Sequence, residues 1–439
     1  MKWIIAILIF SLLILFHEFG HFLMARLNGV AVEEFSLGFG PRLLSAKRGE
    51  TRYSLKLLLF GGSCRMRGML GGTEDEDGNL SPEPGSFQAA SAGQRAAIIF
   101  GGPFFNFLLA WICAVVVLAV VGYDPAVVTS VEDGSAAQQA GLKAGDTITS
   151  FMGRRVEIGR DVDTWFVFHD LSGGQNVTLT FKRDGQTHTV SYTPDVQRRY
   201  MLGLTYSVDG DRAEIQSVSV GSPLDKAGVR AGDVITAVDG TKITTAKSLY
   251  RYFQDHPLGQ SSVKLTLSRG GRFWETDVKP LKRDDVRIGF GYNLGRTKTT
   301  APQVIRLSFV ELRYWIGTTL ESIGALFTGR FGINDLSGPV GIVDVVGTTY
   351  EESRSEGALM TWMNMINLII LLSANLGVMN LLPIPALDGG RLLFLLIEAI
   401  RGKPVNPAVE ASVETVVAVL LMLLMVYVMY HDVLTFVSP

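Results

Sequence analysis

The five residues His17-Glu18-Phe19-Gly20-His21 lie inside an apolar segment that runs from Trp3 to Met24. About 20 apolar residues are what a helix needs to cross a bilayer, so this segment is expected to be a membrane helix. Ionisable side chains at that depth are costly and usually mark a functional site. On a helix the two histidines share one face, where both can bind one Zn²⁺ while Glu18 acts on a zinc-bound water. The other interpretation is a pair of structural histidines that neighbouring helices satisfy.

The composition of the chain favours several membrane spans with soluble modules between them. Of the 439 residues, 47% are hydrophobic and 19% are charged, which suits that class better than one globular domain. The net charge of −2 gives no indication of nucleic acid as a partner. The two cysteines occur in dissimilar contexts, so any bound metal must be held by histidines and carboxylates. Four apolar stretches predict transmembrane helices. The first, second and fourth are expected at 1–27, 95–122 and 409–432, and residues 357–400 are expected to hold the third helix together with the segment Asn380–Arg391.

Basic residues beside these spans predict their orientation. They accumulate between the first and second spans and between the third and fourth, whereas both termini nearly lack them. By the positive-inside rule the two basic connections are cytoplasmic, which places both termini and the segment Gly122 to Met360 outside. The first span also resembles a signal peptide. No Ala-x-Ala-like cleavage site follows it, however, and Phe22-Leu23-Met24 extends its apolar pattern, so we expect it to be retained.

The long outer segment contains an internal repeat. Residues 140–146, Ala-Gly-Leu-Lys-Ala-Gly-Asp, recur as Ala-Gly-Val-Arg-Ala-Gly-Asp at 227–233. Such similarity indicates two tandem copies of one module, and the pattern of each copy resembles a PDZ domain of bacterial proteases. The expected boundaries are 124–208 and 209–282. PDZ domains commonly accept an extended peptide at a sheet edge, for which Leu202-Gly203-Leu204 is the candidate, and the other interpretation is a steric gate over the membrane site.

A third metal ligand is needed, because catalytic zinc sites usually have three protein ligands. The strongest candidate is Asp388, which follows a proline-interrupted stretch at the end of the third span. Irregular backbone at membrane depth is tolerated where it lines a water-filled cavity, and hydrolysis requires such a cavity. The rivals are Glu398, in the next apolar helix, and the pair His431-Asp432, which the predicted topology places on the outer face. Asp388 is alternatively only a helix N-cap.

Two further segments are expected to lie at the membrane. Residues 28–94 are predicted to form a cytoplasmic β-rich element, because Val32–Phe39 and Arg52–Leu57 alternate as strands and Gly61-Gly62 marks a turn. Its strands are either a partner for an unwound substrate, by β-augmentation, or an ordinary amphipathic hairpin on the bilayer. Residues 300–356 are predicted to hold an amphipathic helix along the outer membrane surface.

Taken together, HEFGH, the repeat, Leu336–Gly341 and Asn380–Arg391 resemble, almost end to end, the site-2 protease family of intramembrane zinc metalloproteases in its bacterial RseP-type form with tandem PDZ domains. The resemblance implies a polytopic α-helical protein of the bacterial cytoplasmic (inner) membrane. It would have four transmembrane helices, two inserted extracytoplasmic PDZ-like α+β domains and a cytoplasmic membrane-associated β element. The implied roles are zinc ligands at His17, His21 and Asp388, a catalytic base at Glu18, and substrate-binding positions at Asn380, Pro383 and Pro385.

The implied activity is hydrolysis of peptide bonds within or near the transmembrane segments of single-span membrane proteins. Membrane-anchored anti-sigma factors and remnant signal peptides are the substrates that the resemblance suggests, and the lipid bilayer and peptide ligands of the PDZ-like domains are further partners. An alternative is a non-catalytic, zinc-stabilised scaffold that recruits partners through those domains, for which Glu18 would be dispensable. Metal or solute transport is disfavoured, because the second and fourth spans hold too few ionisable residues to form a polar route.

Overall fold

The computed structural model of the protein describes residues 2–69, 73–74, 80–81, 83–403 and 405–437. The described chain divides into two compact units. The first comprises residues 1–125, 157–168 and 294–439, and the second comprises residues 126–156 and 169–293.

Within the described residues of the first unit, four helices are long and apolar enough to cross a membrane: α1 (Lys2–Leu27), α2 (Ala92–Val121), α9 (Ala358–Leu381) and α11 (Pro407–Val437). They confirm the four predicted spans and make the chain an integral membrane protein. The remaining helices of this unit are α4 (Arg160–Phe168), α7 (Ala301–Phe327), α8 (Pro339–Ser353) and α10 (Asp388–Arg401), with 3₁₀ turns at Ile333–Asp335 and Arg354–Glu356.

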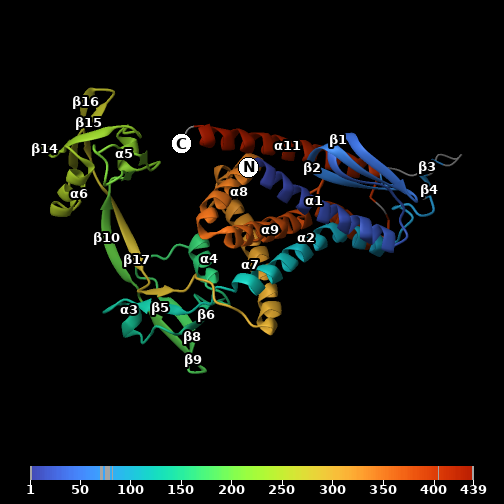
Figure 1. The fold of residues 1–439 in the computed structure, drawn as a ribbon, viewed down its shortest axis with the longest axis horizontal. Helices are drawn as coiled ribbons and strands as arrows, with labels where there is room; N and C mark the ends of the chain where they lie inside the picture. The colour runs from blue at the N-terminus through green and yellow to red at the C-terminus, as the bar shows by residue number, and fades with distance from the viewer. Residues whose placement is uncertain (1, 70–72, 75–79, 82, 404, 438–439) are drawn as a thin grey trace. The chain divides into compact units, whose positions relative to one another are not determined.

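Glycines allow α1 and α2 to pack with their backbones in contact (Figure 1). A Cβ on Gly20 would lie 2.2 Å from the carbonyl oxygen of Gly101, and a Cβ on Gly101 would lie 2.8 Å from the carbonyl oxygen of Gly20. Small residues at such a crossing let membrane helices approach closely where no hydrophobic effect drives them together. The half of α1 that carries HEFGH is therefore pressed against the Gly101 turn of α2.

The helix predicted between residues 300 and 356 is α7, and it packs on α2 and α9. Leu312 and Trp315 of α7 contact a buried group that includes Ala114 of α2 and Met363 of α9. Part of its apolar surface is thus covered by other helices of the same unit, while Phe309 and Phe327 are 57% and 86% exposed. Its expected position along the outer membrane surface stays a prediction.

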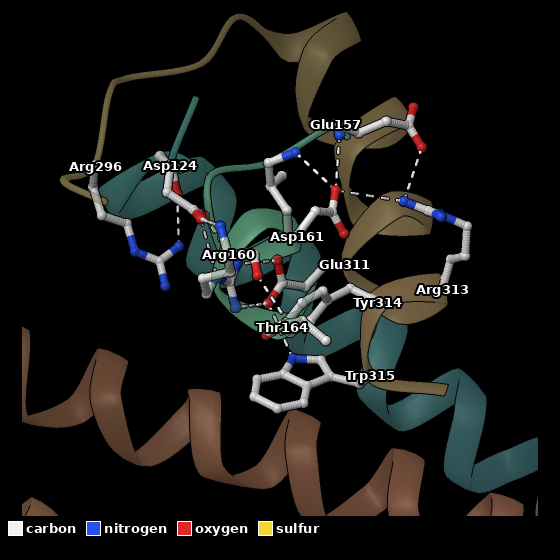
Figure 2. Close-up of polar contacts among 12 residues, drawn as sticks. Asp124, Glu157, Arg160, Asp161, Thr164, Arg296, Glu311, Arg313, Tyr314 and Trp315 are labelled. Atoms are coloured by element: carbon white, nitrogen blue, oxygen red, sulfur yellow. Dashed lines mark hydrogen bonds and ion pairs between the residues drawn. The ribbon is translucent and has the colours of Figure 1, made fainter. Parts of the chain in front are cut away.

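A buried cluster of charges holds α4 on α7 (Figure 2). Arg160 donates through Nη2 to Oδ1 of Asp124 at 2.9 Å and to Oε2 of Glu311 at 2.7 Å, and both carboxylate side chains are only 4% exposed. Burial opposes the charge on Arg160, but the two carboxylates outweigh it and raise the pKa of the guanidinium. Thr164 adds a hydrogen bond to the hydroxyl of Tyr314 at 3.0 Å. Helix α4 is therefore joined to α7 by the largely buried ion pair of Arg160 with Glu311 and by the Thr164–Tyr314 hydrogen bond.

The cytoplasmic element predicted at 28–94 contains a bent antiparallel pair, β1 (Val32–Arg48) and β2 (Thr51–Met66). The first part of β1 pairs with two parts of β2, residues 52–55 on one side and residues 62–66 on the other. Among the described residues, 62–66 therefore form an edge of the sheet. Gly61, with a φ of 106°, bends the strand rather than ending it in the expected turn. A short pair, β3 (Thr73–Glu74) and β4 (Leu80–Ser81), follows.

The second unit contains two four-stranded sheets of the same order, β7-β6-β8-β9 and β14-β13-β15-β16. They confirm the internal repeat. The first sheet consists of β6 (Thr147–Phe151), β7 (Arg154–Arg155), β8 (Val177–Arg183) and β9 (Gln186–Tyr192), and helix α3 (Ala136–Gln139) precedes it. The second consists of β13 (Val234–Val238), β14 (Thr241–Lys242), β15 (Val263–Arg269) and β16 (Arg272–Val278), with helices α5 (Pro223–Lys226) and α6 (Ala246–Asp255).

The repeated Gly-Asp turn has the same partner in both copies. Asp146 pairs with Arg183 at 2.6 Å, and Asp233 pairs with Arg269 at 2.6 Å. Both aspartate side chains are 1% exposed, and each arginine also donates to the carbonyl oxygen of a repeat glycine. The repeated aspartates are therefore structural, since each joins its turn to a sheet strand.

The strand pairing differs from the expected boundaries at 124–208 and 209–282. Strand β11 (Leu204–Thr205) pairs with β12 (Ser217–Val218) of the second copy, and β18 (Phe290–Tyr292) returns to pair with β5 (Val128–Val131) of the first. A ribbon of β10 (Asp195–Met201) and β17 (Leu281–Arg287) connects the copies (Figure 1). The second copy is thus inserted into the first. The repeat spacing does not reveal this insertion, because pairing across 160 residues leaves no local signal.

Candidate active site

Three ligand atoms from two helices meet in the first unit. His17 and His21 lie on α1, and Asp388 is the first residue of α10. The two Nε2 atoms are 3.2 Å apart, and Oδ2 of Asp388 lies 3.3 Å from Nε2 of His17 and 3.4 Å from Nε2 of His21. The structure therefore brings the two histidines of HEFGH together with the aspartate suggested as the third ligand.

The spacing of these atoms fits a zinc ion. Zinc holds nitrogen and oxygen ligands at about 2.0–2.1 Å in a tetrahedron, and such ligands stand about 3.3–3.4 Å from one another. The three observed separations are 3.2, 3.3 and 3.4 Å. In addition, Oδ2 of Asp388 is buried and forms no hydrogen bond with the described residues, although an unsatisfied buried carboxylate oxygen is costly. A cation at this point would satisfy it.

The opposite nitrogen of each imidazole is held by α2. Nδ1 of His21 donates to the carbonyl oxygen of Ile98 at 2.9 Å, and Nδ1 of His17 lies 3.1 Å from the side-chain amide of Asn106. Oδ1 of Asn106 is buried and has no partner among the described residues, and rotation of the amide lets it accept the proton of His17 Nδ1. Such contacts fix the tautomer and leave Nε2 of each histidine directed at the point where the three candidate ligand atoms meet.

Two residues of α2, Gly102 and Asn106, belong to the site although the sequence analysis does not single them out. In a sequence, the stretch Gly101-Gly102-Pro103 by itself indicates only close helix packing. A Cβ on Gly102 would lie 2.4 Å from Nε2 of His21, so this position must lack a side chain for the imidazoles to fit. Asn106 is fully buried, and a polar amide inside an apolar span is the signal that marks it.

A cavity of about 240 Å³ adjoins the three ligand atoms. Glu18 and Arg391 line it, together with residues of the sheet edge at 62–66. Gly62 allows the sheet to lie close to Glu18, because a Cβ there would lie 3.0 Å from Cγ of Glu18. The cavity therefore holds the carboxylate of Glu18 beside the candidate metal ligands and is bordered by an open strand edge.

The rival third ligands have other partners. Glu398 receives two hydrogen bonds from Arg95, at 2.5 and 3.2 Å, and thereby ties α10 to the start of α2. Asp432 accepts from the backbone N–H groups of Gly338 and Gly341, at 3.3 and 2.8 Å, where α8 begins. Asp432 therefore anchors the Leu336–Gly341 motif, and neither carboxylate belongs to the histidine cluster.

Asn380, Pro383 and Pro385 lie where α9 turns into α10. Asn380 is in the last turn of α9, and the prolines are in the connection that precedes Asp388. This connection is tight, because a Cβ on Gly389 would lie 2.2 Å from the carbonyl oxygen of Leu382. These three residues are not among those that line the 240 Å³ cavity, so their substrate-binding role stays a prediction.

Known proteins resemble this chain over nearly its whole length. The profile described as Peptidase family M50 matches residues 5–424. The Zinc metalloprotease RasP of Bacillus licheniformis is 31% identical, over 97% of this chain and 97% of its own. The Regulator of sigma-W protease RasP of Bacillus subtilis is 29% identical, also over 97% of both chains. A solved HtrA3 PDZ domain with a phage-derived ligand covers 20% of this chain and 92% of its own, with 20% identity and a TM-score of 0.18.

The profile spans all four membrane helices up to residue 424, and it includes the HEFGH helix and Asp388. The same positions form the cluster of ligand atoms described above. With a relative that is 31% identical over almost the full length, the chain belongs to peptidase family M50, the family of the site-2 proteases.

Proposed function

We propose that this protein is a zinc metalloprotease that hydrolyses peptide bonds within or next to the transmembrane segments of single-span membrane proteins. One observation carries the proposal: two imidazoles and a carboxylate from two separate helices meet beside Glu18 in one cavity. Membership in a peptidase family supports it, as do relatives named zinc metalloprotease. Because α1 has the length and composition of a membrane span, the reaction would take place at membrane depth.

The catalytic roles follow from the positions of the side chains. Zinc held by His17, His21 and Asp388 would supply Lewis acidity for a water molecule and for the scissile carbonyl. The carboxylate of Glu18 lines the same cavity, so it can take a proton from the attacking water and return one to the leaving amine. The Nδ1 contacts to Ile98 and Asn106 keep the imidazoles in place during this transfer.

The substrate must present an extended backbone, because an intact helix hides its carbonyl groups in i to i−4 hydrogen bonds. We propose that the sheet edge at 62–66 receives the unwound segment by β-augmentation. Support comes from its place in the cavity and from its lack of a second strand among the described residues. Residues 52–55 were considered for this role from the sequence, but they lie inside the sheet.

We propose a location in the bacterial cytoplasmic membrane, since the relatives named above are bacterial proteins. The positive-inside rule supports an orientation with the PDZ-like domains and both termini outside. Anti-sigma factors are the proposed substrates, since one relative is named a regulator of sigma-W protease, and remnant signal peptides are the second candidate. The PDZ-like domains would act outside the membrane, either as peptide binders or as a gate.

Substitution of Glu18 tests the proposal. Glu18→Gln is expected to retain zinc and to abolish cleavage of a single-span reporter, because Glu18 moves protons but is not a ligand. Glu275→Gln is the matched control and should leave turnover unchanged, since Glu275 pairs with Lys264 on the surface of the second unit and does not line the cavity. Cleavage at the wild-type rate by Glu18→Gln would instead support the zinc-stabilised scaffold.

A further inference from the structure

A second, larger cavity lies at one end of the β1–β2 sheet, and the bend that carries Phe39 and Leu58 lies at the opposite end. Its volume is about 820 Å³. It is lined by the end of α1 with Arg26, by the turn Arg48-Gly49-Glu50 between β1 and β2, by Tyr53, and by Arg67 after β2. The lining residues thus include three guanidinium groups but one carboxylate, that of Glu50.

The arginines of this cavity lack the neutralising partners that other basic residues of the sheet possess. Arg42 forms an ion pair with Glu34 at 2.9 Å, and Lys56 lies 4.0 Å from the same carboxylate. Within the described part of the chain, Arg26, Arg48 and Arg67 form no ion pair. The excess positive charge of the cavity therefore suits an anion.

The exposed side chains of the sheet indicate the depth of this cavity relative to the membrane. Its bend exposes large apolar side chains: Phe39 is 52% exposed, Leu44 69% and Leu58 55%. The Arg48 turn lies at the opposite end, about 25 Å away along a strand of about eight residues. Apolar side chains at one end and unpaired arginines at the other match the change from acyl chains to headgroups across one leaflet.

We propose that this cavity binds the phosphate of an anionic phospholipid headgroup at the cytoplasmic surface of the membrane. Guanidinium groups suit this ligand, because they form paired hydrogen bonds with phosphate oxygens. A substrate tail is the poorer occupant, since the cytoplasmic flanks of membrane spans are rich in lysine and arginine and would be repelled. Inorganic phosphate shares the chemistry, and the test below separates it from a lipid.

The test uses the full-length protein in detergent, with bound lipids counted by native mass spectrometry. Phosphatidylglycerol, phosphatidylcholine and inorganic phosphate are the probes. The wild-type chain is expected to bind phosphatidylglycerol in preference to phosphatidylcholine. Arg26→Gln, Arg48→Gln and Arg67→Gln should each weaken that binding about tenfold, as expected for the loss of a charge-assisted hydrogen bond to the phosphate. The matched control is Arg52→Gln, an exposed arginine of the same sheet that does not line the cavity.

Three results would overturn the proposal. One is a loss with Arg52→Gln equal to the loss with Arg48→Gln, because general charge would then explain binding. Another is equal binding of phosphatidylcholine. The third is full displacement of phosphatidylglycerol by inorganic phosphate at equal concentration, which would assign the cavity to the free ion. Arg→Lys variants at the three positions keep the charge but lose the paired hydrogen bonds of the guanidinium, so they should bind more tightly than the Gln variants and less tightly than the wild type.

Discussion

At the scale of single residues, the metal cluster depends on contacts across helices as much as on the HEFGH motif. His17 and His21 follow from their spacing, and Asp388 follows from its position after a broken span. Asn106 and Gly102 could not be predicted in this role, because only the packing of α2 on α1 brings them to the imidazoles. The proposed metal ligands are thus visible in the sequence, whereas the residues that orient them are not.

Asn106 provides a prediction about this orientation. Replacing it with leucine removes the partner of His17 Nδ1, and loss of such a partner typically weakens metal binding 10–100-fold. Asn106→Leu is expected to show that loss in a competition titration with a zinc chelator. Asn375→Leu is the control, because Asn375 is also in a span but bonds to Thr319 instead. Equal zinc affinity in wild type and Asn106→Leu would contradict the orienting role.

At the scale of elements, the paired aspartates of the repeat predict how stability depends on pH. The hydrogen bond from Arg269 lowers the pKa of Asp233 below its ordinary value of 3.8, although burial opposes the shift. A lowered pKa means that the folded state favours the carboxylate. The contribution is therefore complete above pH 3.8 and is lost as the pH falls below that value.

Hydrogen exchange, corrected for intrinsic rates, measures this dependence in the second copy. Protection of β13 and β15 in the wild type should be constant from neutral pH down to about pH 4 and should fall as the pH is lowered further, past the ordinary pKa of aspartate. In Arg269→Gln the protection should already be reduced at neutral pH and should change less with acid. Arg272→Gln, an exposed neighbour on β16, should behave like the wild type. A wild-type profile in Arg269→Gln would contradict the ion-pair explanation.

The docking of α4 on α7 gives a second prediction at this scale. Arg160→Met leaves Asp124 and Glu311 buried without their cation, and removal of one partner from a buried pair costs about 3–5 kcal/mol. We expect faster hydrogen exchange in α4, with α1 and α2 unchanged.

The matched control is Arg306→Met, since Arg306 is 61% exposed and its pair with Glu157 is open to water. Exposed pairs contribute about 0–1 kcal/mol, so this variant should leave α4 protected. Equal effects of the two substitutions would show that the buried pairs do not hold α4.

At the scale of the whole molecule, hydrophobic length and repeats predict most of the architecture. The four spans, the β element and two similar modules follow from local patterns. The insertion of one module into the other does not follow from local patterns. It depends on the pairing of β18 with β5, which occurs only after the β10–β17 ribbon has led the chain back to the first copy. The doubled pairing of β1 with β2 is likewise a product of bending at Gly61.

The central claim is that two distant segments of the chain, α1 and the start of α10, complete one zinc site. Zinc content of the purified full-length protein tests it most directly, with Asp388→Ala compared with the wild type and with Glu398→Gln. The account predicts one zinc per chain in the wild type and in Glu398→Gln, whose carboxylate pairs with Arg95, and loss of zinc from Asp388→Ala. Full zinc content in Asp388→Ala, or its loss in Glu398→Gln alone, would contradict the account.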